Sequence, residues 1–268
     1  MEKAKLLHET AEIALTEIKR FLEPGLMETL SLRRVTAPLF LPVGSELLDK
    51  RHPGVIIHLE GAHEDVEIVG SLDVWLRGQL RRYDTAPGFG VFTIMNAIRP
   101  EMPYNSTTSP HMAAWAWQQA VEPDRLTEKY IIEVAKKLHQ LTVDTEKMVL
   151  ALFPHMQPTI DKELRVVHDE QLAALYPEMN EGRRLYEHMH PRSADGNESV
   201  APMLLMIRKQ AGLAAIGEMW TWNRLLRRPV MIADIAAWYA DTVAGPSVGG
   251  NIYRGTLAIQ ILQQDKLI

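Results

Sequence analysis

The sequence contains no cysteine among its 268 residues. This absence excludes disulfide bridges, thiol catalysis, iron–sulfur clusters and cysteine-bound zinc, and it fits the reducing cytoplasm, where we expect the protein to be located. There is also no run of 18 uninterrupted apolar residues, so we expect no transmembrane helix and no membrane partner. Residues 1–5 carry mixed charges and lack the apolar segment of a signal peptide.

Basic residues are not in excess either. The chain has 29 Lys and Arg and 34 Asp and Glu, which gives a net charge of −5. Such a balance gives no general attraction to a phosphate backbone, so we expect no nucleic-acid partner. Three common motifs do not occur: the phosphate-binding G-x-x-x-x-G-K-[ST], the dinucleotide-binding G-x-G-x-x-G and the G-x-S-x-G of serine hydrolases.

Hydrophobic periodicity nevertheless predicts a folded chain with both helices and strands. Helical spacing of apolar residues predicts helices over residues 2–31 (interrupted at 23–25), 71–82, 125–152, 169–176, 234–241 and 253–263. Extended patterns predict strands over residues 34–43, 55–59, 66–69, 90–98, 112–118 and 164–167. Residues 201–207 and 213–222 fit either element. Strands 90–98 and 112–118 would form a hairpin, and this mixture with no clear linker predicts one α+β domain.

A glycine-rich segment, residues 245–250, is predicted to form a turn just before the last helix. Backbone amides at the start of a helix bind anions, and Arg254 would add positive charge there. A tight turn followed by a solvated arginine is the alternative that this pattern alone favours. Arg99 at the mouth of the hairpin presents the same choice between an anion clamp and a surface ion pair.

Aromatic and histidine side chains indicate a ligand or metal site less strongly than the glycine-rich segment and Arg99 indicate an anion site. Trp115 and Trp117 are two residues apart in a predicted strand, so their side chains lie on the same face. Packing in the hydrophobic core is the simpler explanation for them. The more specific alternative is that they form a wall on which a planar ligand stacks. His188 and His190 resemble half of a metal site, but no third ligand is suitably spaced, so we expect no metal there.

Several short stretches, taken together and in order, resemble asparagine synthetase A, the aspartate–ammonia ligase family. They are residues 36–44 (TAPLFLPVG), 69–77 (VGSLDVWLR), 92–100 (FTIMNAIRP), 109–110 (SP), 115–117 (WAW), 166–172 (VVHDEQL), 176–177 (YP), 222–223 (WN) and 248–254 (VGGNIYR). The resemblance is near-continuous over residues 8–190 and patchy over residues 200–264. The chain is identified as a divergent and shortened member of this family.

This resemblance implies the catalytic fold of class II aminoacyl-tRNA synthetases, an antiparallel sheet flanked by helices, as a single domain over residues 1–268 and as a homodimer. It implies that ATP converts a carboxylate into an acyl-adenylate, from which ammonia displaces AMP. Arg99 and Asp49 would be catalytic. The residues implied for nucleotide binding are Arg99, Glu101, Gly249, Gly250 and Arg254. Of the two arginines, Arg99 would grip the α-phosphate and Arg254 the distal phosphates.

The substrate positions depart from the family pattern. In the family's S-L-x-K-W-K-R the second lysine is replaced here by Leu76, and in its D-Q-W-D-W-E the glutamine and second aspartate are replaced by Ala114 and Ala116. The positions implied for substrate binding are Ser71, Leu76, Arg77, Ala114, Trp115, Ala116 and Trp117. Alanine cannot orient an ammonium group and leucine cannot pair with a carboxylate, so the acid is expected to differ from aspartate in its usual pose.

We therefore expect an ATP-dependent, AMP-forming ligase that joins a small carboxylic acid to ammonia or another amine. Two alternatives stay open: a non-catalytic relative that binds a nucleotide or another ligand, and a fold repurposed for ATP-independent chemistry. The carboxylates that would hold Mg²⁺ near the glycine-rich segment are not apparent, so the metal ligands are undefined.

Overall fold

A computed structural model describes residues 8–61, 63–104, 109–190 and 203–262. Its centre is an eight-stranded sheet in the order β1-β5-β6-β11-β10-β9-β8-β7. Both outermost pairs, β1 with β5 and β7 with β8, are parallel, and all pairs between them are antiparallel. The strands are β1 Leu32–Arg34, β5 Gly90–Ile98, β6 His111–Ala120, β7 Leu164–His168, β8 Met203–Arg208, β9 Leu213–Asn223, β10 Arg228–Trp238 and β11 Ser247–Tyr253.

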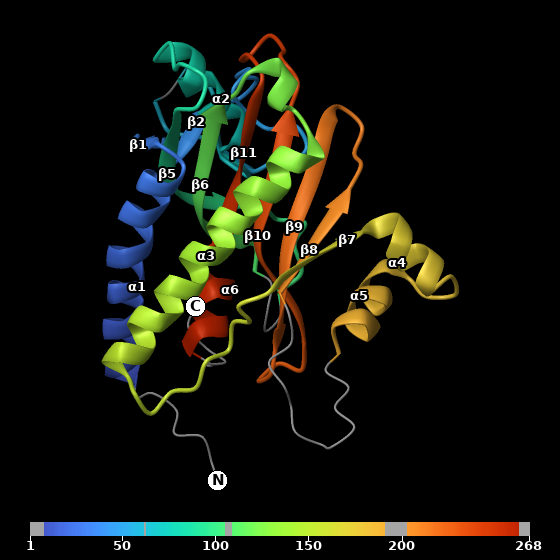
Figure 1. Ribbon diagram of the computed structural model, residues 1–268. Coiled ribbons are helices and arrows are strands. Elements are labelled where there is room, and N and C mark those ends of the chain that lie inside the picture. The colour runs from blue at the N-terminus through green and yellow to red at the C-terminus, as the bar shows by residue number, and fades with distance from the viewer. Residues whose placement is uncertain (1–7, 62, 105–108, 191–202, 263–268) are drawn as a thin grey trace.

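Helices cover both faces of this sheet (Figure 1). The long helices α1 (His8–Thr29) and α3 (Glu128–Leu152) lie on one face together with α6 (Arg254–Leu262), and they enclose the larger apolar core. Helix α2 (Asp73–Arg82) packs on the opposite face against residues of β5 and β6. The remaining elements are α4 (Asp169–Leu175), α5 (Glu181–Met189), a short 3₁₀ turn (Pro123–Arg125) and a small sheet of β2 (Phe40–Pro42), β4 (Val66–Ile68) and β3 (Val55–Ile57).

The predicted α+β class, with a mainly antiparallel sheet flanked by helices, is confirmed. The hairpin of β5 and β6 forms with Phe92 opposite Trp117 and Thr93 opposite Ala116. Of the two ambiguous apolar stretches, residues 203–207 belong to β8 and residues 213–222 to β9, while residues 201–202 lie outside the described residues. Among the described helices, none is long and apolar enough to cross a membrane.

Three local predictions are wrong. Residues 234–241 were expected to be helical, but they belong mostly to β10, a central strand whose apolar residues face both layers and therefore lack the alternation of a surface strand. Residues 247–250 of the expected turn are instead in β11. The expected interruption at residues 23–25 does not occur, because α1 continues through Pro24, with Leu22 and Leu26 fully buried on either side of it.

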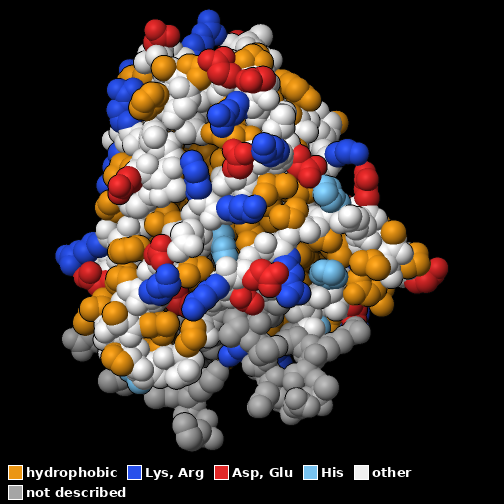
Figure 2. All heavy atoms as spheres, viewed as in Figure 1, with side chains coloured by type: hydrophobic (Ala, Val, Ile, Leu, Met, Phe, Trp, Pro, Cys, Tyr) orange, Lys and Arg blue, Asp and Glu red, His pale blue; other side chains and the backbone are white. Residues whose placement is uncertain are grey.

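Figure 2 shows the face that carries α1 and α3. Lys and Arg side chains alternate there with Asp, Glu and hydrophobic side chains. In this view the described surface has no continuous basic area.

Candidate active site

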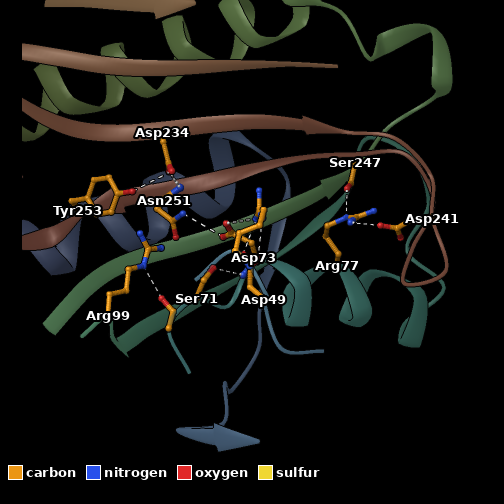
Figure 3. A network of polar contacts seen from close by, with 12 residues as sticks. Asp49, Ser71, Asp73, Arg77, Arg99, Asp234, Asp241, Ser247, Asn251 and Tyr253 are labelled. Atoms are coloured by element: carbon orange, nitrogen blue, oxygen red, sulfur yellow. Dashed lines mark hydrogen bonds and ion pairs between the residues drawn. The ribbon is translucent and has the colours of Figure 1, made fainter. Parts of the chain in front are cut away.

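A polar network lies on the sheet face that α2 covers (Figure 3). Ala116 of β6 pairs with Asn251 of β11, and Asn251 pairs with Asp234 of β10. Directly paired residues in an antiparallel sheet point to the same side, so Asn251 and Asp234 are presented side by side. Asp73, the first residue of α2, meets them from above the sheet through a hydrogen bond with Asn251.

Arg99 directly follows β5 and is 8% exposed. Its Nε donates a hydrogen bond to the carbonyl oxygen of Gly70 at 2.8 Å, and its backbone N–H donates to the carbonyl oxygen of Pro110 at 2.8 Å. The side chain and the backbone of Arg99 are therefore each fixed by one hydrogen bond, and the positive charge of the guanidinium acts on the carboxyl groups of Asp73 and Asp234.

Asp49 is buried and forms a bidentate ion pair with Arg51. Its Oδ1 accepts from Arg51 Nε at 3.0 Å and from the Arg51 backbone N–H at 3.1 Å, while Oδ2 accepts from Nη2 at 2.7 Å. Burial raises the pKa of Asp49, but the hydrogen bonds and charge of Arg51 outweigh burial and the net pKa is lowered. The same guanidinium lies 4.2 Å from the ring centre of Trp238 and 3.8 Å from Asp73 Oδ2.

Asn251 joins the two remaining carboxylates. Its backbone N–H donates to Asp234 Oδ1 at 2.8 Å, and its Nδ2 donates to Asp73 Oδ1 at 3.3 Å. The hydroxyl of Tyr253 donates to Asp234 Oδ2 at 3.1 Å. Burial, and then the charge of Asp73, raise the pKa of Asp234 to about 6. Burial and the charge of Asp49 also raise the pKa of Asp73.

The charges of this network affect the pKa of His52. Burial, followed by the positive charge of Arg99, lowers the pKa of His52 from its ordinary value. This shift favours the neutral imidazole over the charged one.

The structure brings Asp49, Ser71 and Arg99 of the predicted site residues into or beside this network. Ser71 is 2% exposed, and its Oγ accepts from the backbone N–H of Asp73 at 3.1 Å. This bond fixes the start of α2 and with it the Asp73 carboxylate.

Three of the predicted substrate residues lie in an apolar layer next to the network. Leu76, Ala114 and Ala116 are fully buried in the cluster between α2 and the sheet. Their packing closes this part of the face, so the described conformation offers a substrate no direct contact with them.

Arg77 has a separate set of partners. Its Nη1 donates to Asp241 at 2.7 Å, Nη2 to the Tyr239 carbonyl oxygen at 3.1 Å and Nε to Ser247 Oγ at 3.2 Å. All three lie at the connection between β10 and β11, so this buried arginine fastens α2 to the sheet.

Trp115 and Trp117 share one strand face, as their alternation predicted, but it is the face of α1 and α3. Both are buried in the larger core, and Trp115 Nε1 donates to Glu23 Oε1 of α1 at 2.9 Å. Their packing role is thus the one that the structure supports, and neither ring lines the polar network.

The two glycines expected to pass close to a nucleotide lie inside β11, where they make room for protein atoms. A Cβ at Gly249 would come within 2.1–2.3 Å of the Gln118 side-chain amide, and a Cβ at Gly250 would come within 1.9 Å of the Asp234 carbonyl oxygen. The predicted helix-start anion loop is therefore wrong in its local geometry, because these amides belong to a sheet.

Arg254 begins α6 and is not joined to the network of Arg99. Its Nη2 donates to Asn96 Oδ1 at 2.7 Å, and burial lowers its pKa, an effect that the charge of Glu23 on α1 opposes. Glu101 is exposed in a turn after β5. Among the described residues, no group of three or more His, Asp or Glu side chains is placed to hold a metal ion.

The sequence analysis missed most of the network. One feature of the sequence could have indicated Asp234: it is an acidic residue within the otherwise apolar run of residues 230–237. The other missed residues, Arg51, Asp73, Asn251 and Tyr253, carry no such signal, because only folding brings residues 49–51, 73 and 234–253 together.

Comparison with solved structures defines the class of fold. The chain superposes on the asparaginyl-tRNA synthetase of Entamoeba histolytica in complex with asparaginyl-adenylate with a TM-score of 0.67 at 8% identity, over 96% of this chain and 65% of that one. The asparaginyl-tRNA synthetase of Pyrococcus horikoshii complexed with asparaginyl-adenylate gives a TM-score of 0.68 at 10% identity, over 95% of this chain and 66% of that one. The architecture is that of a class II aminoacyl-tRNA synthetase catalytic domain, and the chain spans about two thirds of these longer proteins.

Sequence comparison then defines the family. The aspartate-ammonia ligase family model matches residues 9–194. The aspartate–ammonia ligase of Bacteroides fragilis is 26% identical over 262 residues, which is 95% of this chain and 76% of that protein. That of Ruminiclostridium cellulolyticum is 32% identical over 177 residues, 65% of this chain and 53% of that protein. The chain belongs to the aspartate–ammonia ligase family.

Proposed function

We propose that this protein is an ATP-dependent ligase that activates a carboxylic acid as an acyl-adenylate and transfers the acyl group to ammonia or another amine. The observation that carries the proposal is Arg99, buried and fixed by Gly70 beside the Asp73 and Asp234 carboxylates, in a chain of the aspartate–ammonia ligase family. A buried guanidinium with a defined position is a group that can stabilise charge developing on a phosphate.

The chemistry then has two steps. An oxygen of the acid attacks the α-phosphorus of ATP and pyrophosphate leaves, which converts a poor leaving group into AMP. The nitrogen of the amine next attacks the acyl carbon, the C–O bond to AMP breaks, and the nitrogen loses a proton. Arg99 would meet the negative charge on the α-phosphate in both steps.

The acid substrate is proposed to be larger or less charged than aspartate. Leu76, Ala114 and Ala116 offer neither a charge nor a hydrogen-bonding group, and they pack as one apolar layer. These three residues are buried and make no contact with a substrate in the described conformation, but positions without a charge or hydrogen-bonding group cannot support a partner for a second carboxylate or an ammonium group at this part of the site.

The described residues form no all-protein magnesium cage, and an ion held by one or two carboxylates would need ATP phosphate oxygens among its other ligands. Both oxygens of Asp234 already accept hydrogen bonds, from Asn251 and Tyr253, and no group of three acidic or histidine side chains is available in the described part of the chain. We derive no catalytic step through a metal bound by these residues.

One observation favours the alternative of a non-catalytic binder. Arg254, implied to grip the distal phosphates, is engaged with Asn96 and is not part of the Arg99 network. Repurposed, ATP-independent chemistry is the other alternative, and both alternatives predict no adenylation.

The test is ATP–pyrophosphate exchange with a panel of carboxylic acids, aspartate included, in the presence of magnesium. We expect exchange that depends on one class of acid and falls at least about 100-fold in Arg99→Gln. The matched control is Arg20→Gln, which removes an arginine whose side chain is 71% exposed on α1 and should leave exchange unchanged.

Absence of exchange with every acid, from protein that is folded by circular dichroism, would overturn the proposal. Nucleotide binding without exchange would then support the non-catalytic binder, and small-molecule binding without nucleotide binding would support the repurposed enzyme. We also propose that the chain acts as one domain, residues 1–268, within a homodimer.

A further inference from the structure

Arg51 is the accessible part of the acidic network beside Arg99. Its side chain is 36% exposed, whereas the side chains of its ion-pair partners Asp49 and Asp73 are 2% and 13% exposed. The two carboxylates therefore lie beneath the guanidinium. A group that enters the network from solvent on this side meets Arg51 first.

The guanidinium of Arg51 is held in one position. It forms a bidentate pair with Asp49, through Nε at 3.0 Å and Nη2 at 2.7 Å, and the Arg51 backbone N–H binds the same carboxylate. The central carbon of the guanidinium lies 4.2 Å from the ring centre of Trp238, and the same ring also contacts the buried Arg77 at 4.7 Å. Charge-assisted pairing and a cation–π contact both favour an ordered guanidinium over a solvated one.

Arg51 is also a counter-ion for more than one carboxylate. Burial lowers the pKa of Arg51, but the hydrogen bond and charge of Asp49 oppose burial. The charges of Asp73 and Asp234 act in the same direction as that of Asp49, and the net pKa of Arg51 is raised. Arg99 acts on the same two carboxylates, Asp73 and Asp234, so Arg51 and Arg99 belong to one electrostatic unit.

An ammonium group on a substrate would need the carboxylates that Arg51 already pairs. Displacing the guanidinium would break a bidentate ion pair whose carboxylate is buried, and such a pair is costly to break. We propose that Arg51 is a specificity-determining residue, whose guanidinium serves as a built-in counter-ion and restricts the ligase to carboxylic acids that carry no amino group near the reacting carboxyl. The substrate class rests on the proposed ligase function, whereas the placement of Arg51 in the acidic network does not.

The test compares acids that differ only by an amino group, succinate with aspartate and glutarate with glutamate, in ATP–pyrophosphate exchange. In the wild type we expect kcat/KM for the acid without the amino group to be at least about tenfold higher than for its amino-acid partner. In Arg51→Ala this ratio should fall about tenfold, chiefly through a lower KM for the amino acid. Arg51→Lys keeps a cation at the position and should keep the ratio of the wild type.

Arg20→Ala is the matched control. Arg20 also forms an ion pair at 2.7 Å, with Glu17, but its side chain is 71% exposed on α1. The ratio between the paired acids should be unchanged in this variant. A purely structural role of Arg51 would lower kcat/KM for both acids together, and the ratio would then stay constant in Arg51→Ala.

A second measurement tests the placement of Arg51 without catalysis. Low concentrations of methylguanidinium chloride should raise the melting temperature of Arg51→Ala more than sodium chloride does at equal ionic strength, because the added cation refills the place of the deleted side chain. In the wild type and in Arg20→Ala the two salts should have the same effect.

A wild type that uses aspartate or glutamate as well as the partner acid, or an unchanged ratio in Arg51→Ala, would overturn the proposed substrate class. If Arg51→Ala does not fold, the ratios of the wild type and of Arg51→Lys still decide. Equal effects of methylguanidinium on the wild type and on Arg51→Ala would overturn the placement of Arg51 as a built-in counter-ion. If the wild type shows no exchange with any acid, the ligase proposal fails, while the methylguanidinium measurement still decides on that placement.

Discussion

Gly250 shows how one missing side chain shapes the polar network. It lies opposite Ile235, next to the pair of Asn251 and Asp234, and a Cβ on it would meet the backbone carbonyl oxygen of Asp234. The sequence analysis assigned this glycine to a nucleotide loop because Gly249 and Gly250 precede a helix. The structure instead explains Gly250 by the close approach of β10 and β11.

We expect Gly250→Ala to lower the free energy of unfolding by about 3 kcal/mol, because a backbone atom at 1.9 Å cannot move aside as a side chain could. Gly245→Ala is the control, since a Cβ there meets no atom within 4 Å. Urea denaturation of both variants measures the difference. Equal stability of the two variants would contradict the close packing of β10 against β11.

Helix α2 is fixed to the sheet by both apolar and polar contacts. Trp75, Leu76 and Leu80 pack on β5 and β6, while Arg77 reaches the connection between β10 and β11. Trp238 of β10 contacts the guanidinium groups of Arg51 and Arg77, at 4.2 and 4.7 Å from its ring centre. The position of Asp73 at the start of α2 therefore depends on these distant contacts.

Removing the arginine in Arg77→Met should lower the free energy of unfolding by about 3 kcal/mol, from three hydrogen bonds at about 1 kcal/mol each. Arg81→Met on the same helix is the control, because its guanidinium forms one exposed hydrogen bond with the Thr242 carbonyl oxygen. Thermal and urea unfolding compare the variants. If Arg77→Met costs no more than Arg81→Met, the contacts of Arg77 do not anchor α2.

At the scale of the whole molecule, large apolar side chains are exposed on and beside the small sheet of β2, β4 and β3. Five large side chains that are 42–57% exposed lie on or next to its strands: Leu39, Phe40, Val43, Ile56 and Leu59. Phe40 and Ile56 pair with the adjacent residues Ile68 and Glu67 of β4, so they lie on opposite faces of the small sheet, and an interface over this sheet would cover part of the exposed apolar surface. This region is therefore where we place the contact of the proposed homodimer.

Light scattering is expected to give about 61 kDa, twice the 30.4 kDa of one chain. Ile56→Glu should shift the protein toward the monomer, because a carboxylate is costly to bury in an interface. Leu175→Glu on α4, a site that is 62% exposed, is the control and should leave the mass unchanged. A wild-type mass of 30.4 kDa at high concentration would exclude a stable dimer.

Much of the fold could be predicted from local pattern. The strands of the β5–β6 hairpin and the helices α2 and α3 follow from the spacing of apolar residues within single elements of 9 to 25 residues. The central strand β10 could not, since residues 233–237 are apolar apart from Asp234 and the same run suits a helix or a strand. The candidate site was predictable only where motifs matched the family, as at Asp49, Ser71 and Arg99.

The sequence by itself determined the α+β class, the family resemblance and the absence of cysteine chemistry, because composition, period and ordered motifs are local properties of the chain. Only the tertiary structure decided which residues share the site. Strand pairing places Asn251 beside Asp234, and the packing of α2 brings Asp73 to them across 178 positions of sequence. The tertiary structure also decided that Trp115 and Trp117 are core residues. Their strand face became buried because helices α1 and α3 cover that side of the sheet.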